Sequence, residues 1–431
     1  MRAGGSSSTC PGITAEAPTT LYSVVITPFT VTHNPFVYGE VVPAAAFVDR
    51  ATELDRLVAD LAAAQKVFLI SPRRYGKSSL IRRALALMSR RGALTVEVTV
   101  SSFSSYMAFL EGYARALVAA ETQWERARTW LRDAIRSART EVRYDPDASS
   151  IARKGALPRS RSARTASAQL GSVAVSFPDV GSEREISRLA QEVFALPARL
   201  AEIRRRKVIV ALDEFQAIGG FDGGSVEHAL RTAVQHQREV GYVFAGSEPS
   251  LMERMLGPRR PFYKAGPVIR LGKIPADEFA ASIETRFKES GIVPETHLGA
   301  AIVELAENLP YDVQRLAHET WDEVRTAGRR RATLDDLHHA LRRLLGEQQT
   351  MFEALWQRLT LAQRAVLRAV VLQDGYELLS ADVRTRYRLG GPSTVQASLS
   401  ALVRDDVLAR EQDRYVVVDS LLREWVARQT F

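Results

Sequence analysis

Gly76, Lys77 and Ser78 stand in succession, and residues of these types in this order can bind a phosphate chain. A glycine lets the backbone approach a ligand closely, a lysine ammonium can reach the β- and γ-phosphates, and a serine hydroxyl can complete the coordination of Mg²⁺. The apolar run 67–70 before them is typical of a buried strand, and a helical pattern starts near Lys77. Free N–H groups at a helix start attract anions. The segment therefore predicts a site for a nucleoside triphosphate.

The first position of this motif departs from the usual pattern G-x-x-x-x-G-K-[ST], because Ser71 stands where a glycine is usual. A serine carries a Cβ atom where glycine adopts positive φ freely, so we expect a lower affinity for the ligand than usual. A chance Gly-Lys-Ser at a helix start is the alternative interpretation. The residues of this segment expected to contact the nucleotide are Ser71, Pro72, Arg73, Arg74, Tyr75, Gly76, Lys77, Ser78 and Ser79.

Two carboxylates, Asp213 and Glu214, follow a second apolar run at 208–212. Beside the phosphate loop, Asp213 is expected to hold Mg²⁺ through its waters, together with Ser78. Glu214 is expected to orient and deprotonate the attacking water, and Lys77 to neutralise charge in the same reaction. The alternative for the pair by itself is a strand that ends in a solvated acidic turn. Combined with the upstream motif, the pair predicts phosphoryl transfer from ATP.

The elements that must position these residues follow from the pattern of apolar runs. Between about residues 34 and 255, short apolar runs alternate with helical patterns, which is typical of an α/β fold with a parallel sheet covered by helices. After Pro275 the pattern is helical and indicates a small lid. The predicted strands are 67–70, 94–100, 208–212, 242–245 and, as a fifth candidate, 268–271, and the predicted lid helices are 277–290, 297–308, 313–326 and 334–345.

The last part of the chain has three helical patterns, two short strands and a final helix, which is typical of a winged helix-turn-helix. Its third helix offers only Arg404 as a cation, whereas DNA binding needs cations on phosphates and side chains at base edges. Contact with DNA and contact with a protein partner both stay open. The predicted elements are helices 361–373, 380–388 and 393–405, strands 407–410 and 415–418, and helix 420–429.

These patterns divide the chain into four parts. A flexible N-terminal tail at 1–33 precedes a P-loop core at 34–274, a helical lid at 275–350 and a winged helix-turn-helix at 351–431. Within the core, residues from about 126 to 168 form a basic insertion, which we interpret as a basic helix followed by a loop. An exposed insertion without a dedicated role and a basic arm on nucleic acid are its two interpretations.

The composition narrows the class of protein. A net charge of +8 favours polyanionic partners. The single cysteine, Cys10, excludes an intrachain disulfide and a cysteine-based metal site, which suits a reducing compartment, and we expect a cytoplasmic protein. Because the sequence has no apolar run of about 18 or more residues, no membrane span is expected.

Several motifs in a fixed order resemble the archaeal-type ATPases, a prokaryotic branch of the AAA+/STAND P-loop proteins. The resemblance extends from Asn34 to about residue 325, and the winged helix is a frequent addition in that family. It implies an AAA+-like P-loop fold that binds ATP and Mg²⁺. The motifs are N-P-F-V-Y-G at 34–39, F-V-D-R-A-T-E-L at 47–54, S-P-R-R-Y-G-K-S-S-L at 71–80, L-D-E-F-Q at 212–216 and Y-V-F-A-G-S at 242–247.

The resemblance assigns further roles by position. Ser247 would be the polar sensor of the γ-phosphate, with a strand-end turn as the alternative. Asn308-Leu-Pro-Tyr resembles the proline motif of a lid helix, so Pro310 would pack near the ribose or base, and Arg315 would face the phosphates or belong to the lid core. The residues implied near the adenine are Phe36, Tyr38, Phe47 and Arg50.

The arginine that such proteins direct at a neighbouring nucleotide is not evident. Where the family often has Tyr-Gly-Arg, this sequence has Tyr followed by Lys264 and Ala265. Arg259 or Arg260 could replace the missing arginine, or either could be a plain surface charge.

Three functions follow from these residues. The first is a nucleotide-dependent switch that hydrolyses ATP slowly with Mg²⁺. The second is an ATP-regulated DNA-binding protein that acts through the winged helix, and the third is an ATP-binding signalling or scaffold protein with little turnover. The expected partners are ATP and either DNA or a protein, without a membrane, and a homo-oligomer is left open.

Overall fold

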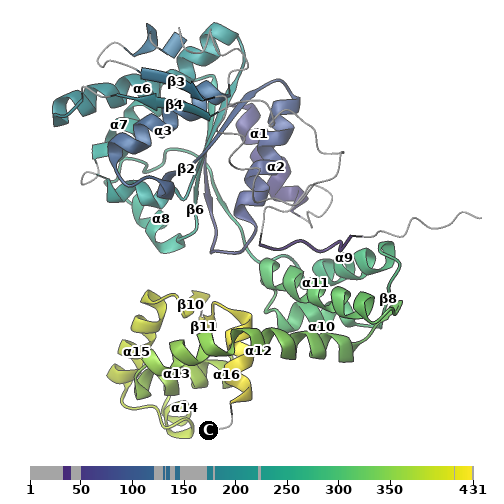
Figure 1. Cartoon of the computed structure of the whole chain (residues 1–431). Coiled ribbons are helices and arrows are strands. Elements are labelled where there is room, and N and C mark those ends of the chain that lie inside the picture. The colour runs from purple at the N-terminus through teal and green to yellow at the C-terminus, as the bar shows by residue number, and fades with distance from the viewer. Residues whose placement is uncertain are drawn as a thin grey trace, which may run out of the picture.

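The structure is a computed structural model of the chain. It describes residues 33–39, 50–120, 130–131, 133–135, 141–145, 172–177, 180–221, 225–411 and 413–429. Figure 1 shows an α/β body, a helical body and a C-terminal body, and the last two lie on the same side of the first. The expected N-terminal tail lies outside the described residues except for His33.

A five-stranded sheet forms the centre of the α/β body, and all of its pairings are parallel. Its strands in chain order are β1 (Lys66–Ile70), β2 (Leu94–Thr99), β5 (Val208–Asp213), β6 (Val240–Gly246) and β7 (Val268–Arg270). The spatial order is β2-β5-β6-β1-β7, so β6 lies between β1 and β5. The five predicted strands and the α/β fold are confirmed, with strand ends shifted by one or two residues.

Both faces of the sheet are buried, which explains why its strands are apolar throughout. Val67 and Leu69 of β1 join a buried cluster on one face, and Phe68 and Ile70 join a second cluster on the other. Helices α1 (Ala51–Ala62) and α2 (Lys77–Arg90) cover the first face, and α3 (Tyr106–Ala119), α6 (Glu183–Arg204) and α7 (Ser225–Val234) cover the second.

The parallel arrangement decides where the chemistry can take place. The carboxyl ends of β1, β5 and β6 lie at one edge of the sheet, because neighbouring strands run in the same direction. The phosphate loop follows β1, the acidic pair ends β5, and Ser247 follows β6. The fold therefore brings together three segments that lie far apart in the sequence.

The basic insertion differs from the expectation where the structure describes it. A helix was expected in its first half, but Glu141–Asp145 form strand β3, which pairs antiparallel with β4 (Ser172–Ser176). The expectation is therefore wrong for these five residues. Alternation of Val142 and Tyr144 with polar residues suits a strand at least as well as a helix. The Ser/Arg-rich segment 153–169 lies outside the described residues.

The helical body confirms the four predicted lid helices. They are α9 (Ala276–Glu289), α10 (Leu298–Leu305), α11 (Pro310–Thr326) and α12 (Leu334–Arg358), and a short parallel pair of strands, β8 (Val293–Pro294) and β9 (Arg331–Ala332), joins their connections. The N-terminal segment 33–39 lies along this body, where Asn34 donates to the backbone oxygen of His318 at 3.0 Å.

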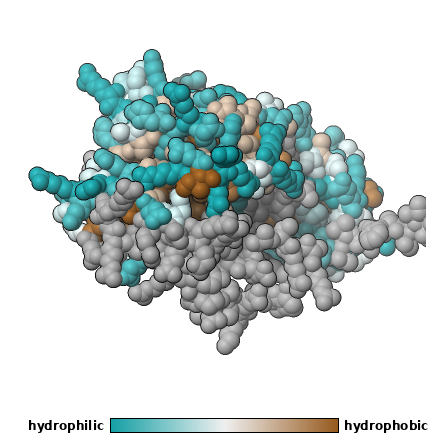
Figure 2. Space-filling model, turned by 90° about the horizontal axis from the view of Figure 1, so that it is seen from above, coloured by the Kyte–Doolittle hydropathy of each residue, from teal (hydrophilic) through white to brown (hydrophobic). Residues whose placement is uncertain are grey.

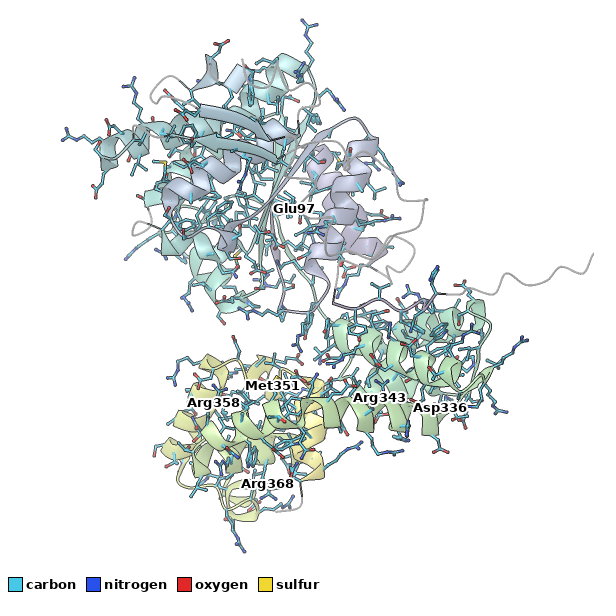
Figure 3. The ribbon with its side chains drawn as sticks, viewed as in Figure 1. Glu97, Asp336, Arg343, Met351, Arg358 and Arg368 are labelled. Atoms are coloured by element: carbon cyan, nitrogen blue, oxygen red, sulfur yellow. The ribbon has the colours of Figure 1, made fainter. Side chains whose placement is uncertain are left out.

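Helix α12 extends well past its expected end at residue 345 and passes without a break through the expected lid limit at 350. Gly346 lies inside this helix, and a single glycine in a helix costs only about 1 kcal/mol relative to alanine. The good helix formers that follow it continue the helix, and Met351 and Arg358 lie along its second half in Figure 3.

The C-terminal body has the elements expected of a winged helix. They are α13 (Leu361–Leu372), α14 (Ala381–Arg386), α15 (Pro392–Arg404), β10 (Leu408–Glu411), β11 (Arg414–Val417) and α16 (Ser420–Arg428), and β10 and β11 pair antiparallel. One hydrophobic cluster joins this body to the lid, since Phe352 and Trp356 of α12 lie 6.0 and 5.9 Å from the ring of Trp425.

The face of the molecule seen from above is mostly hydrophilic where it is coloured, with hydrophobic residues in small groups (Figure 2). Within the described residues, no helix combines the length and apolar content that crossing a membrane requires.

Candidate functional site

The phosphate loop runs from Ser71 to Gly76 and ends at the first turn of α2. Gly76 precedes the helix with φ +83°, and Arg74 also adopts a left-handed conformation, with φ +70°. No side chain caps the start of α2. Its first N–H groups are therefore available to an anion, as binding of a phosphate requires.

The positive φ on which the lower affinity expected for Ser71 was based does not occur. Arg74 and Gly76 are the loop residues with positive φ, and Ser71 is not among the residues in that region. Its N–H donates to the oxygen of Gly246 at 3.2 Å, and the residue is buried. Ser71 thus continues the pairing of β1 with β6, and its Cβ causes no backbone conflict.

Lys77 joins the loop to the acidic pair at the end of β5. Its Nζ donates to Oδ1 of Asp213 and, at 3.3 Å, to Oε1 of Glu214. The Ser78 hydroxyl donates to Oδ2 of Asp213 at 2.8 Å. Lys77 and Asp213 are each only 6% exposed, so the two charges compensate each other in a buried setting. The expected approach of the phosphate loop to the carboxylates is therefore present in the structure.

Glu214 lies at the centre of a small polar network. Oε2 accepts hydrogen bonds from Ser247 Oγ at 2.5 Å and from Gln216 Nε2 at 2.6 Å. Burial by itself raises the pKa of this carboxyl, but the hydrogen bonds from Ser247 and Gln216 and the charge of Lys77 lower the pKa below its ordinary value. Glu214 is thus ionised at neutral pH, as a proton acceptor must be.

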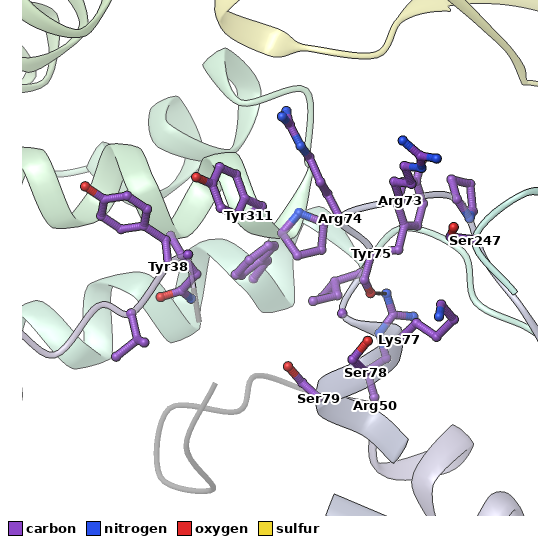
Figure 4. Close-up of a pocket in the computed structure, with 18 of the residues that line it drawn as sticks. Tyr38, Arg50, Arg73, Arg74, Tyr75, Lys77, Ser78, Ser79, Ser247 and Tyr311 are labelled. Carbon is purple, nitrogen blue, oxygen red and sulfur yellow. Dashed lines mark hydrogen bonds between the residues drawn. The ribbon is translucent and has the colours of Figure 1, made fainter. Parts of the chain in front are cut away.

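A cavity of about 290 Å³ opens between the α/β body and the lid (Figure 4). One end is lined by the phosphate loop with Glu214 and Ser247, and the other by segment 37–39 with the start of α11. The lining residues predicted from the sequence are Tyr38, Arg50, Pro72, Arg73, Arg74, Tyr75, Gly76, Lys77, Ser78, Ser79, Glu214, Ser247 and Pro310; Val37, Gly39, Ile274, Phe279, Tyr311 and Gln314 were not singled out.

Some predicted residues support the cavity without lining it. Asp213 accepts hydrogen bonds from Lys77 and Ser78, which line the cavity, and Ser71 is buried at the end of β1 and does not line the cavity. Phe36 is buried in the lid against Phe287, with ring centroids 4.8 Å apart, so its expected place near the adenine is wrong. Phe47 lies outside the described residues.

Arg50 lines the cavity but has a structural contact that the sequence did not predict. Its guanidinium donates to the backbone oxygens of Tyr75 at 3.1 Å and Gly272 at 2.8 Å. A nearly buried arginine thus ties the phosphate loop to the segment that leads into the lid.

The two arginine assignments have different outcomes. Arg315 does not reach the phosphate loop, because its guanidinium donates to the side-chain oxygen of Gln348 on α12, at 2.5 and 2.8 Å, once that amide is oriented to accept. Of the two interpretations of Arg315, the structure therefore supports a place in the lid core and not one that faces the phosphates. Arg259 and Arg260 are exposed and lie outside the cavity lining.

The C-terminal body contacts the phosphate loop directly. Arg73 lies 3.9 Å from Asp406, Arg74 lies 3.3 Å from Asp419, and the Tyr75 hydroxyl donates to Glu411 at 3.0 Å. We call these three pairs the loop–wing contact. Figure 4 shows the Arg73 and Arg74 side chains extending from the loop toward the C-terminal body. The side chains of the loop thus contact the winged helix, whereas the N–H groups at the start of α2 have no side-chain cap.

Asp312 of α11 lies under this contact and links three parts of the chain. It is 2% exposed, accepts from the Ser420 hydroxyl at 2.8 Å and lies 4.0 Å from Arg74. Burial and the nearby charge of Asp419 raise the pKa of Asp312 to about 6, against the opposing effects of Ser420 and Arg74. The charge of Asp312 is therefore costly to bury. Its hydrogen bond from Ser420 connects the winged helix to the lid.

Comparison with known proteins establishes the fold. Residues 350–428 match a family described as a probable winged helix domain. The Walker-type ATPase of Pyrococcus abyssi has a similar structure, with a TM-score of 0.57 and 15% identity over 91% of this chain and 99% of that one. The Aeropyrum pernix ORC2 protein, solved in ADPNP–ADP complexes, also has a similar structure, with a TM-score of 0.53 and 12% identity over 91% of this chain and 96% of that one. No curated protein sequence matches.

At these identities the likeness concerns the fold alone. The chain shares with these two structures an α/β core with a parallel sheet, and its C-terminal part is a winged helix, as expected from the sequence.

Proposed function

We propose that this protein binds ATP with Mg²⁺ in the cavity between the α/β body and the lid, hydrolyses it slowly, and acts as a nucleotide-dependent switch. One observation carries the proposal: the uncapped helix α2 begins with Lys77, which is paired with two carboxylates at the end of strand β5. That combination supplies an anion site, a cation for phosphates and a base. The Pyrococcus abyssi neighbour is named an ATPase, which supports the same function.

The donors at the phosphate end fit a magnesium ion. The Ser78 hydroxyl and the Asp213 carboxylate lie 2.8 Å apart and offer oxygen atoms from two different elements. Magnesium prefers oxygen ligands and keeps several of its waters, so one hydroxyl and one carboxylate suffice from the protein. A bound ion at this position would neutralise charge on the phosphates.

Each remaining residue has a role that follows from its contacts. Lys77 would exchange part of its pairing with Asp213 and Glu214 for the β- and γ-phosphates when ATP enters. Glu214 would then be free to accept a proton from water, while Ser247 and Gln216 hold its second oxygen in place. Substitutions at Lys77 and Glu214 separate binding from turnover.

The loop–wing contact supports a switch rather than a constitutive enzyme. Asp406, Glu411 and Asp419 place negative charge beside the loop that would hold the triphosphate. Salt largely screens exposed charges only beyond the Debye length of about 8 Å, so negative charges on either side of one loop repel each other. ATP and the docked winged helix therefore oppose each other, and the position of the winged helix would report the state of the nucleotide site.

Neutralising the acidic side of this contact should strengthen ATP binding. The variant Glu411→Gln/Asp419→Asn keeps the shape of both side chains, and asparagine still caps α16. A charge-assisted hydrogen bond and an exposed ion pair are together worth about 2 to 4 kcal/mol. We expect a Kd for Mg·ATP about tenfold lower, measured by calorimetric titration, and the increase in affinity should shrink at high salt.

The matched control is Glu377→Gln/Asp382→Asn, which removes two charges from exposed positions of the same domain. It should leave the Kd unchanged. An equal increase in affinity in both variants would mean that net charge alone controls binding, and no increase in either would remove the proposed opposition between ATP and the winged helix.

A second candidate function is DNA binding through the winged helix. The specific observation is that Arg386 and Arg388 are exposed just before α15, whose exposed face carries Ser393, Thr394 and Gln396. Arginines beside the start of such a helix are suitably placed for phosphates, and small polar side chains can reach base edges. The wing, by contrast, contacts the phosphate loop through Glu411.

A salt-titrated duplex-binding assay tests this candidate. The double variant Arg386→Ala/Arg388→Ala should bind about tenfold more weakly, and the slope of log K against log salt should fall by about 2, since each lost phosphate contact removes about 0.9. The control Arg330→Ala/Arg331→Ala removes two exposed lid arginines and should change neither quantity. Absence of duplex binding by the parent even at low salt would remove this candidate.

A further inference from the structure

The end of the cavity opposite the phosphate loop is suited to a flat aromatic group. Tyr38 and Tyr311 meet there edge to face, with ring centroids 5.9 Å apart, and Val37, Phe279 and Pro310 add apolar surface. Aromatic side chains bind any base through its face, so they provide affinity with little discrimination. A residue that distinguishes one base from another must offer hydrogen bonds instead.

Gln314 is the amide side chain in this part of the lining. It lies on α11 one turn after Pro310 and Tyr311, so all three share one face of the helix. The residue is 5% exposed, and within the described part of the chain its Oε1 has no hydrogen-bond partner. A buried amide oxygen without a partner is rare in native proteins and calls for an explanation, such as a ligand.

We infer that Gln314 is the specificity residue for the base and that it selects adenine over guanine; this inference rests on the proposed ATP site. The 6-amino group of adenine would donate to Oε1, and the adjacent ring nitrogen would accept from Nε2. Paired hydrogen bonds between a glutamine amide and adenine are a known recognition mode. On the edge where adenine offers the 6-amino group and N7, guanine offers only acceptors, O6 and N7, so neither orientation of the amide can bond both. The last torsion of a glutamine is soft, so a small rotation aligns the amide with the ring.

The inference is tested by removing the same hydrogen bond from each side in turn. The probes are ATP and purine riboside triphosphate, which lacks the 6-amino group, and the proteins are the full-length parent and Gln314→Leu. In the parent, loss of the amino group should raise the Kd about tenfold. In Gln314→Leu the two nucleotides should bind within about twofold of each other, because the partner of the amino group is gone.

A second variant changes the preference instead of removing it. Gln314→Arg offers only donors, which match O6 and N7 of guanine. The ratio of the Kd values for GTP and ATP should therefore shift toward GTP by about tenfold. The control Gln349→Arg adds the same charge at an exposed position of α12 and should leave the ratio unchanged.

The outcomes separate this inference from the proposed function. If the folded parent binds none of the nucleotides, both are wrong. If ATP binds but the 6-amino group contributes equally in the parent and in Gln314→Leu, or if the parent prefers GTP, the role of Gln314 is overturned while the nucleotide site stands. Because Gln314→Arg reports a ratio within one protein, it decides the matter even where Gln314→Leu fails to fold.

Discussion

Lys77→Ala should raise the Kd for Mg·ATP at least about 100-fold and make binding undetectable in an ordinary calorimetric titration. The ammonium is the cation nearest to the expected β- and γ-phosphates. Its removal also leaves Asp213 and Glu214 without the positive charge that now lies between them. Two uncompensated carboxylates would then repel the triphosphate, so both effects act in the same direction.

The same variant carries a risk for stability, because removing one partner of a buried ion pair costs about 3 to 5 kcal/mol. Thermal unfolding of Lys77→Ala therefore belongs to the experiment, and Lys77→Met, which retains most of the side-chain volume, is its second form. Lys288→Ala, an exposed lysine of α9, is the control and should bind ATP like the parent. Parent-like affinity in a folded Lys77 variant would show that the phosphates are held elsewhere.

Glu214→Gln should bind ATP within about threefold of the parent but release phosphate at least about 100-fold more slowly, in line with the usual contribution of a general base. The amide has nearly the same shape as the carboxylate, and its oxygen can still accept from Ser247. It cannot take a proton from water. Single-turnover phosphate release with saturating Mg·ATP measures the effect directly.

Glu253→Gln is the matched control, because it changes an exposed glutamate of α8 (Pro249–Met255) in the same way. It should release phosphate at the parent rate. If Glu214→Gln does the same, Glu214 is not the base, even where Lys77→Ala confirms the binding site.

Protein concentration distinguishes the switch from a binding protein with little turnover. A rate of phosphate release that rises more steeply than the protein concentration would indicate an arginine supplied by a second copy of the chain. Arg259 and Arg260 are exposed and suited to that role. ATP binding without release at any concentration would instead favour a signalling or scaffold protein.

Much of the fold was predictable because it depends on local signals. The apolar runs that became β1, β5 and β6 are buried on both sides, and only a sheet with two covered faces requires such runs. Lys77, Ser78 and Asp213 were also predictable, because their spacing from strand ends decides where they lie in a parallel sheet.

The parts that could not be predicted depend on orientation or on distant contacts. Gln314 and Arg315 are neighbours in sequence, but one residue along a helix is a rotation of about 100°, which directs one toward the cavity and the other toward α12. The loop–wing contact joins residues more than 300 positions apart, and ordinary surface charges give no sequence signal of their partners.

The unbroken course of α12 has a mechanical consequence. Its 25 residues extend for about 37 Å, so a tilt of about 10° at the lid end would displace the far end by about 6 Å. The pairs between loop and wing are 3.0 to 3.9 Å long, and a displacement of that size would part all of them together. If α12 moves as one rigid unit, a slight closure of the lid around the base would therefore break the three pairs together and release the C-terminal body from the phosphate loop.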